Sequence, residues 1–73
     1  MSTYKYKYKI GLATDQGRCI SDYLRAKTYE QALDEALART IRFQRPNELV
    51  HQTIYRSIPN TAAYDIVHEE IYP

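Results

Sequence analysis

The sequence predicts an α+β domain, in which a small antiparallel sheet in the order β-β-α-β-β carries one amphipathic helix on one of its faces. Two observations support this prediction. Residues 4–13 alternate in character with the period of a strand, and residues 29–43 show the capping and the periodicity of a helix. With 73 residues, the chain has room for a single domain.

The first strand is expected over residues 4–13, because tyrosine and lysine alternate there and unlike side chains therefore point to opposite faces. Asp15-Gln16-Gly17-Arg18 supplies turn residues, and Gly17 readily adopts a positive φ. The extended pattern of residues 19–26 is expected to complete a β-hairpin around this turn at 15–18.

Thr28 and Gln31 have the spacing of a capping box, in which Thr28 accepts a hydrogen bond from the Gln31 amide and the Gln31 side chain reaches back to Thr28. A helix is therefore expected over residues 29–43, and Pro46 ends it. The spacing predicts a core-facing stripe of Tyr29, Leu33, Ala36, Leu37, Thr40 and Ile41.

Residues 47–58 fit either a strand or a helix, because apolar side chains recur there at helical spacing while Val50, Thr53 and Ile54 are typical of strands. A strand over 49–57 is preferred, since a lone hairpin is only marginally stable in water. Pro59-Asn60-Thr61 then indicates a turn. A fourth strand is expected over 63–71, with polar and apolar side chains mixed on both of its faces.

Charge is spread unevenly along the chain, although the net charge is only +1. Residues 1–45 hold nine Lys/Arg and five Asp/Glu, whereas residues 46–73 hold one and four. This distribution can steer a charged partner, but the two sets of charges can equally face each other within one small domain.

The sequence carries no catalytic or metal-binding signature. His51 and His68 lie in different expected strands without a neighbour at zinc-ligand spacing, and Cys19 has no histidine beside it. Gly11 and Gly17 form no phosphate-binding fingerprint. We therefore expect a non-catalytic protein with no metal and no cofactor. The single cysteine and the lack of a signal-like or membrane-spanning segment indicate a cytoplasmic protein.

The alternating first strand is the main candidate for a contact surface. Aromatic rings on a sheet can stack on bases while lysines neutralise phosphates, but opposite-facing side chains favour ordinary amphipathic construction. Buried tyrosines would leave the lysines as the contact surface, exposed ones would form an aromatic docking patch, and the lysines would also protect an edge strand. The candidate partner-binding residues are Tyr4, Lys5, Tyr6, Lys7, Tyr8, Lys9, Arg42 and Arg45.

Arg42 and Arg45 are included because they lie near the expected helix end, where they can meet phosphates or an acidic surface or can satisfy the last helix carbonyls. The chain also has eight tyrosines, more than a core of this size can bury with every hydroxyl satisfied. Several tyrosines are therefore expected at the surface, where Tyr and Arg are typical of protein interfaces.

In its length, its surplus of tyrosine and arginine and its lack of a catalytic motif, the chain resembles small phage-encoded host-takeover proteins. These include the RNA polymerase-binding transcription regulators of Xanthomonas phages and anti-CRISPR proteins. The resemblance is to the class and transfers no residue. It implies a stoichiometric regulator in the host cytoplasm that binds a large host protein complex, with RNA polymerase favoured and a defence complex as the alternative. A nucleic-acid-binding module that uses the basic first half is the remaining alternative.

Overall fold

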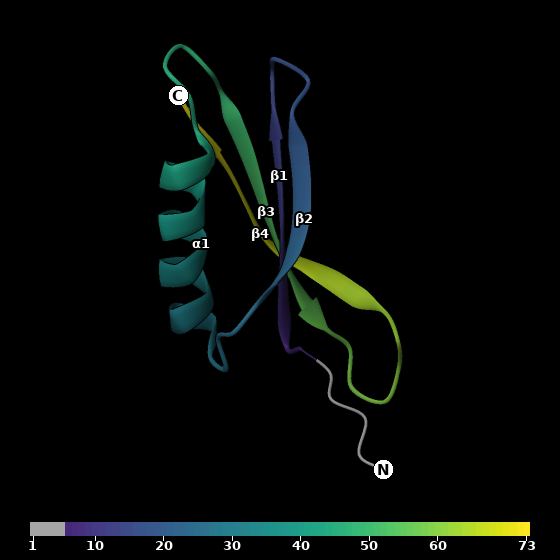
Figure 1. Ribbon diagram of the computed structural model, residues 1–73. Helices are drawn as coiled ribbons and strands as arrows, with labels where there is room; N and C mark the ends of the chain where they lie inside the picture. Colours follow the sequence, from purple (N-terminus) through teal and green to yellow (C-terminus); the bar gives the residue numbers. More distant parts are fainter. Residues whose placement is uncertain (1–5) are drawn as a thin grey trace.

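The structure, a computed structural model, describes residues 6–73 and shows one four-stranded antiparallel sheet with one helix (Figure 1). The elements are β1 (Tyr8–Thr14), β2 (Cys19–Leu24), α1 (Tyr29–Phe43), β3 (Val50–Ser57) and β4 (Tyr64–Tyr72). The strands lie in the order β2-β1-β3-β4, so β2 and β4 form the two edges. The predicted α+β class and the β-β-α-β-β order are confirmed.

The strands differ from the expected ranges mainly at their ends. The first begins at Tyr8 because the chain bends at Lys7, and residues 4–5 lie outside the described part of the chain. The second ends at Leu24, since the next two backbone amides turn to the carboxylate of Glu35 on α1. β3 begins one residue later than expected. β4 is shifted by one residue at both its start and its end.

β1 lies in the interior of the sheet, paired along its length with β2 on one side and β3 on the other. The interpretation of its lysines as guards of an exposed edge strand is therefore wrong. The reason is non-local, because β3 follows the helix in sequence and still occupies the free edge of the first hairpin.

α1 spans the range expected from the capping box and the periodicity. The Thr28 hydroxyl accepts a hydrogen bond from the Gln31 amide at 3.2 Å, as a capping residue does. The Gln31 side chain accepts from the Lys27 amide at 3.0 Å, so it reaches one residue further back than expected. At the other end, the backbone N–H of Gln44 donates to the Thr40 carbonyl at 2.9 Å and closes the last turn.

The helix faces the sheet mainly through small residues, and only part of the stripe expected from the sequence is buried. Ala32, Ala36 and Thr40 are fully buried, whereas Leu37 and Ile41 are 43% and 66% exposed. Small side chains let the helix axis lie close to the sheet, which rotates the larger residues out to one flank. The expected stripe is therefore confirmed for Ala36, Thr40 and Leu33, the last of which packs against the core, and wrong for Leu37 and Ile41.

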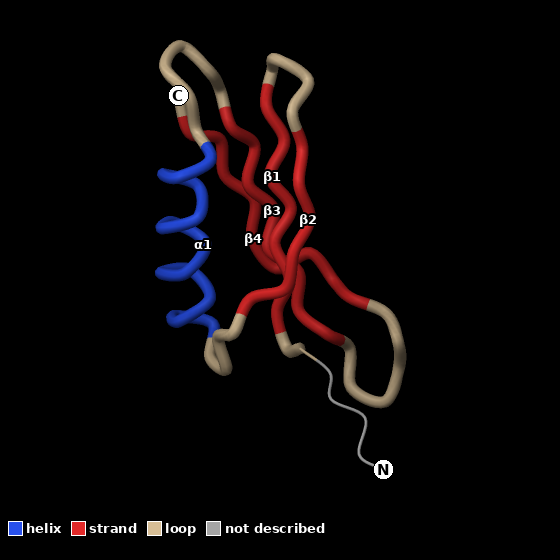
Figure 2. The backbone as a smooth tube through the Cα atoms, in the orientation of Figure 1, coloured by secondary structure: helices blue, strands red, loops and turns tan. Residues whose placement is uncertain are grey.

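The core lies between α1 and one face of the sheet. Its strand residues are Tyr8, Ile10 and Leu12 of β1, Leu24 of β2, and Val50 and Ile54 of β3. The opposite face of the sheet has no helix over it (Figure 2). Among residues 6–73, no helix is long and apolar enough to cross a bilayer.

A β-bulge in β4 interrupts the simple alternation expected for the fourth strand. Ile54 pairs with His68 but the next residue, Tyr55, pairs with Ile66, which leaves Val67 as the extra residue. Side chains before and after the bulge therefore point to different faces from those that simple alternation gives. The β3–β4 hairpin continues past the helix and lengthens the molecule to 45 × 21 × 21 Å (Figure 1).

Candidate functional site: the open face of the sheet

The helix-free side of the sheet is the candidate functional site. Opposite residues of paired strands share a face, so the register defines this surface as rows across the four strands. From β2 to β4 the rows are Tyr23, Lys9, Tyr55 and Ile66; Ser21, Gly11, Thr53 and Glu69; and Cys19, Ala13, His51 and Ile71. These residues are called the open face below.

One end of the open face carries a tyrosine cluster, made of Tyr6, Tyr23, Tyr55 and Tyr64 around Lys9. The rings of Tyr6 and Tyr23 stack with centroids 5.0 Å apart, and Tyr64 lies 6.4 Å from Tyr23. The ammonium of Lys9 lies 5.5 Å from the Tyr55 ring and 5.6 Å from the Tyr64 ring, in the range of cation–π contacts. Burial, with Tyr23 nearby, raises the pKa of Tyr64, so the cluster keeps that phenol neutral.

Small side chains hollow the middle of the open face. Gly11, Ala13 and Ser21 contribute to a depression of about 250 Å³. A second depression of about 320 Å³ adjoins it and is lined in part by Leu49 and Ile71. A bulky side chain of a partner can therefore come close to the strand backbones between the tyrosine cluster and the end of the open face near Leu49 and Ile71.

The open face exposes large apolar side chains and few charges. Tyr23, Ile66 and Ile71 are 46%, 55% and 65% exposed, although they lie on a sheet face. Apart from Lys9, its charged groups are Glu69 and, when protonated, the neighbouring His51, whose Nε2 lies 3.3 Å from the Glu69 carboxylate. Exposed aromatic and aliphatic side chains around a cavity are typical of protein-binding surfaces.

The open face also brings Cys19 and His51 into one row, with Ala13 between them. The Nε2 of His51 lies against Glu69 of β4, on the side away from Cys19. Within residues 6–73 there is no hydrogen bond between these two side chains and no group of three potential metal ligands. The row therefore shows no assembled nucleophile and base.

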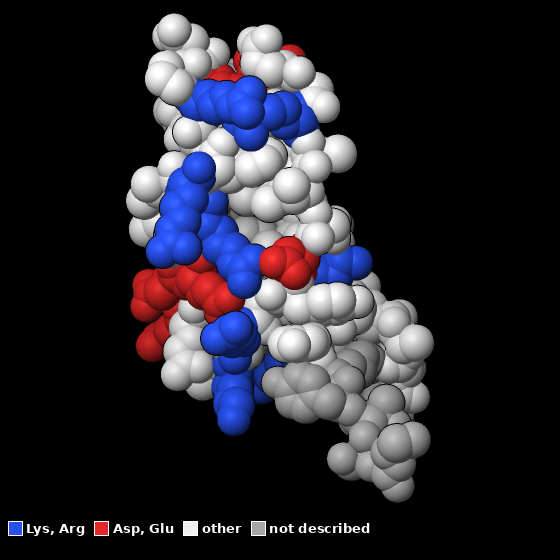
Figure 3. Space-filling model, in the orientation of Figure 1, with Lys and Arg blue, Asp and Glu red and all other residues white. Residues whose placement is uncertain are grey.

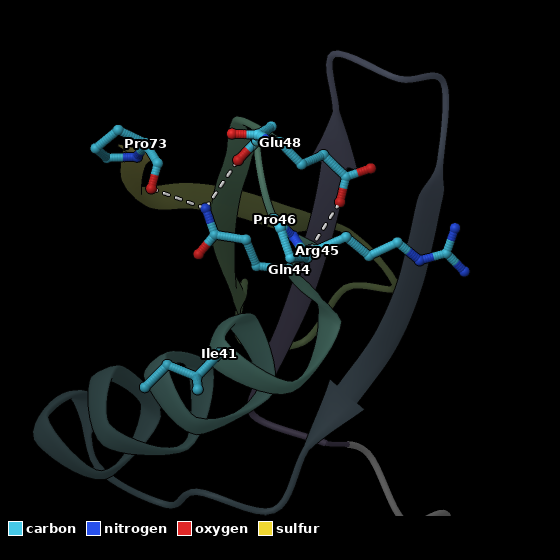
Figure 4. Close-up of a pocket in the computed structure, with 7 residues that line it drawn as sticks. Ile41, Gln44, Arg45, Pro46, Glu48 and Pro73 are labelled. Carbon is cyan, nitrogen blue, oxygen red and sulfur yellow. Dashed lines mark hydrogen bonds between the residues drawn. The ribbon is translucent and has the colours of Figure 1, made fainter.

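A separate hollow of about 340 Å³ lies at the C-terminal end of α1 (Figure 4). The side-chain amide of Gln44 lies across it and donates to the backbone carbonyls of Glu48, Tyr72 and Pro73 at 2.9, 3.3 and 2.9 Å. These bonds tie the helix end to the start of β3 and the end of β4. Because the side-chain N–H groups of Gln44 are used in these bonds, we assign this hollow a structural role.

The candidate residues from the sequence do not form one surface. Tyr8 is in the core at 2% exposure, while Tyr6 precedes β1 and joins the tyrosine cluster. Lys9 lies on the open face, whereas Arg42 and Arg45 lie at the end of α1. The remaining candidate with a described position, Lys7, is exposed before β1, and Tyr4 and Lys5 lie outside the described residues.

Neither alternative posed for the first strand is therefore correct as stated, since one of its tyrosines is buried and another is exposed. The contributions of Tyr23, Ile66 and Ile71 were missed. Their side chains meet on one face only through strand pairing and the β4 bulge, and local sequence patterns carry no signal for either.

Comparisons of the chain with known protein families, with curated protein sequences and with solved structures found no match. The function proposed below therefore rests on the geometry and chemistry of the chain itself, together with the resemblance of class described above.

Proposed function

We propose that the chain is a non-catalytic regulator that binds a large protein complex through the open face. The observation that carries this proposal is the gathering of exposed tyrosine and isoleucine side chains around a hollow on the helix-free side of the sheet. Burial of such side chains in a partner's pockets is the usual source of binding energy at protein interfaces.

The charge of the open face favours a protein partner over a nucleic acid. Among the described residues of the open face, Lys9 is the only Lys or Arg, and its ammonium already contacts Tyr55 and Tyr64. Glu69, on the same face, would repel phosphates. Base-stacking sheets need cations beside the aromatic rings to neutralise the backbone, and this face has too few.

The side of the molecule that contains the open face is large enough for a stable protein complex. Its outline, from extents of 45 × 21 Å, is roughly 900 Å², against roughly 800 Å² that each partner contributes to a standard interface. Bacterial RNA polymerase is the first target to test, because the resemblance to phage host-takeover proteins favours it, with a defence complex as the alternative.

The experiment is an affinity pull-down from a bacterial lysate with three baits: the wild-type chain, Tyr23→Ala and Tyr29→Ala. Tyr29 is a matched control, because it is 40% exposed, close to the 46% of Tyr23, but lies on α1 away from the open face. Far-UV circular dichroism confirms that each bait is folded.

Mass spectrometry should identify the RNA polymerase subunits in stoichiometric amounts with the wild-type and Tyr29→Ala baits. Tyr23→Ala should weaken the retention at least about 30-fold, as expected for an interface anchor. If the wild-type and Tyr29→Ala baits retain a defence complex and Tyr23→Ala does not, the open face is still the binding surface and the target is that complex. Equal retention by all three baits, or no retained protein at all, would contradict the proposed use of the open face.

A further inference from the structure

Lys and Arg side chains outnumber Asp and Glu on one side of the molecule, where a smaller group of acidic side chains lies beside them (Figure 3). The flank of α1 and the loops before and after β2 and after α1 carry a group of cations that runs down the face seen in Figure 3. This group, called the basic side, consists of Arg18, Arg25, Lys27, Arg39, Arg42 and Arg45. β4, at the other edge of the sheet, carries Asp65, Glu69 and Glu70.

Two of the arginines are held by carboxylates. The Arg18 guanidinium donates to the buried carboxylate of Glu48, with the Nε bond at 3.0 Å. Arg39 donates to Asp22 of β2 and, at 3.3 Å, to Glu35. These contacts lower the pKa values of Asp22 and Glu48, so both carboxylates are ionised and fully engaged at neutral pH.

The other four cations have no carboxylate partner among the described residues: Arg25, Lys27, Arg42 and Arg45. Arg45 uses its backbone amide to bind Glu48 at 3.1 Å, while its guanidinium extends away from that carboxylate (Figure 4). Arg42 follows Arg39 by three residues and therefore lies on the same flank of the helix.

Among the described residues, the four cations form no ion pair with the acidic residues of β4. β4 lies three strand spacings, about 14 Å, from the β2 edge that Arg25 adjoins, and this exceeds the screening length of about 8 Å at physiological ionic strength. Glu30 and Asp34 of α1 share the helical spacing of the exposed Leu37 and lie on the opposite flank. The basic side holds six cations and the three carboxylates of Asp22, Glu35 and Glu48, so it keeps a net charge of +3.

We propose that the basic side binds the phosphate backbone of a nucleic acid, independently of the open face. The four cations without a carboxylate partner supply the charge. A hollow of about 400 Å³ that Arg18 and Arg45 share is also lined by the amide residues Gln16 and Asn47 and by Glu48, whose carboxylate is held by Arg18. Arginine, lysine and side-chain amides are the groups that contact phosphate oxygens in complexes with DNA. The exposed apolar residues that a protein partner would need are concentrated on the open face instead.

The number of free cations sets the expected salt dependence. Each phosphate contact releases counterions, so four contacts to duplex DNA predict a slope of log K against log [salt] of about −3.6. Affinity should then fall about 150-fold between 50 and 200 mM NaCl. Contacts to the phosphate backbone also predict little preference among sequences.

The test is fluorescence anisotropy of a labelled 20-base-pair DNA duplex, titrated with the full chain at several salt concentrations. Arg42→Gln and Arg45→Gln should each reduce the steepness of the slope by about 0.9, and the double variant should bring it to about −1.8. Arg56→Gln is the charge-matched control, because Arg56 is also exposed but lies on β3, outside the basic side. It should leave the slope near the wild-type value.

Absence of binding at 50 mM NaCl, or an Arg56→Gln effect equal to that of Arg45→Gln, would overturn the proposal. Light scattering without DNA tests a different occupant, since the acidic β4 edge of a second copy is also complementary to the basic side. If the chain self-associates at low salt and the Arg42→Gln/Arg45→Gln variant does not, the partner of the basic side is a second copy of the chain. That result would overturn the nucleic-acid proposal. Tyr23→Ala should bind DNA normally, so failure of the open-face proposal is distinguishable from failure of this one.

Discussion

Thr40 and Gln52 form a buried polar contact that joins α1 to the middle of β3. The Gln52 Nε2 donates to the Thr40 hydroxyl at 2.8 Å, and that hydroxyl donates to the Ala36 carbonyl at 2.8 Å. Thr40 and Gln52 are 0% and 1% exposed, so water cannot replace a lost bond. Thr40→Val keeps the shape of the side chain and leaves one Gln52 N–H without its acceptor.

An unsatisfied buried donor costs about 1–3 kcal/mol, and valine and threonine have similar helix propensities, so the free energy of unfolding should fall by about that amount. Urea denaturation followed by circular dichroism measures this loss. With a slope of about 1 kcal/mol/M for a small domain, the midpoint should fall by about 1–3 M. Thr53→Val is the control, because it removes a β3 hydroxyl that forms no hydrogen bond within residues 6–73.

The double variant Thr40→Val/Gln52→Leu separates hydrogen bonding from packing. Its loss should be smaller than the sum of the two single losses by about 1 kcal/mol, because removing both polar groups leaves no orphaned donor. A Thr40→Val loss within about 0.5 kcal/mol of zero, or strict additivity of the two changes, would refute the reasoning.

Three further predictions concern local devices of the fold. The Arg18 hydrogen bond lowers the pKa of Glu48 from 4.5 to about 2, so the folded state binds fewer protons than the unfolded state between these values. The free energy of unfolding should therefore fall as the pH drops from about 4.5 to 2, and Glu48→Gln should remove this component of the fall in urea midpoints measured across that range. Gly17 has φ of 85°, with open space around a Cβ, so Gly17→Ala should cost about 1–2 kcal/mol through backbone strain alone; an unchanged melting temperature would contradict this. Thr28→Ala removes the helix cap and should cost about 1 kcal/mol in the same melting assay, whereas a neutral result would mean that water caps Gln31 equally well.

The parts of the fold that were predictable from the sequence depend on interactions between near neighbours. Thr28 and Gln31 set the start of α1, and Gly17 sets the turn of the first hairpin, because capping and turn conformation involve only a few adjacent residues. The ranges of the strands could be predicted to within a few residues for the same reason. The face of α1 could be predicted only in part, since the burial of Ala32 in place of Leu37 and Ile41 depends on the sheet that packs against the helix.

The candidate site was predictable only in part. A surplus of tyrosines indicated that some must be exposed, but the cluster around Lys9 depends on the register of four strands. The bulge at Val67 places Ile66 beside Tyr55, and no local pattern predicts an extra residue at that point.

By itself the sequence determined the α+β class, the order of the elements, the amphipathic helix and the excess of basic residues in the first half of the chain. These features follow from period, capping and composition, which act locally along the chain. Only the tertiary structure decided that β1 is central, that its lysine contacts tyrosines of β3 and β4, and that cations gather on the flank of α1 and in the loops beside β2. Strand order and register determine these features, because they bring together residues that are far apart in the sequence.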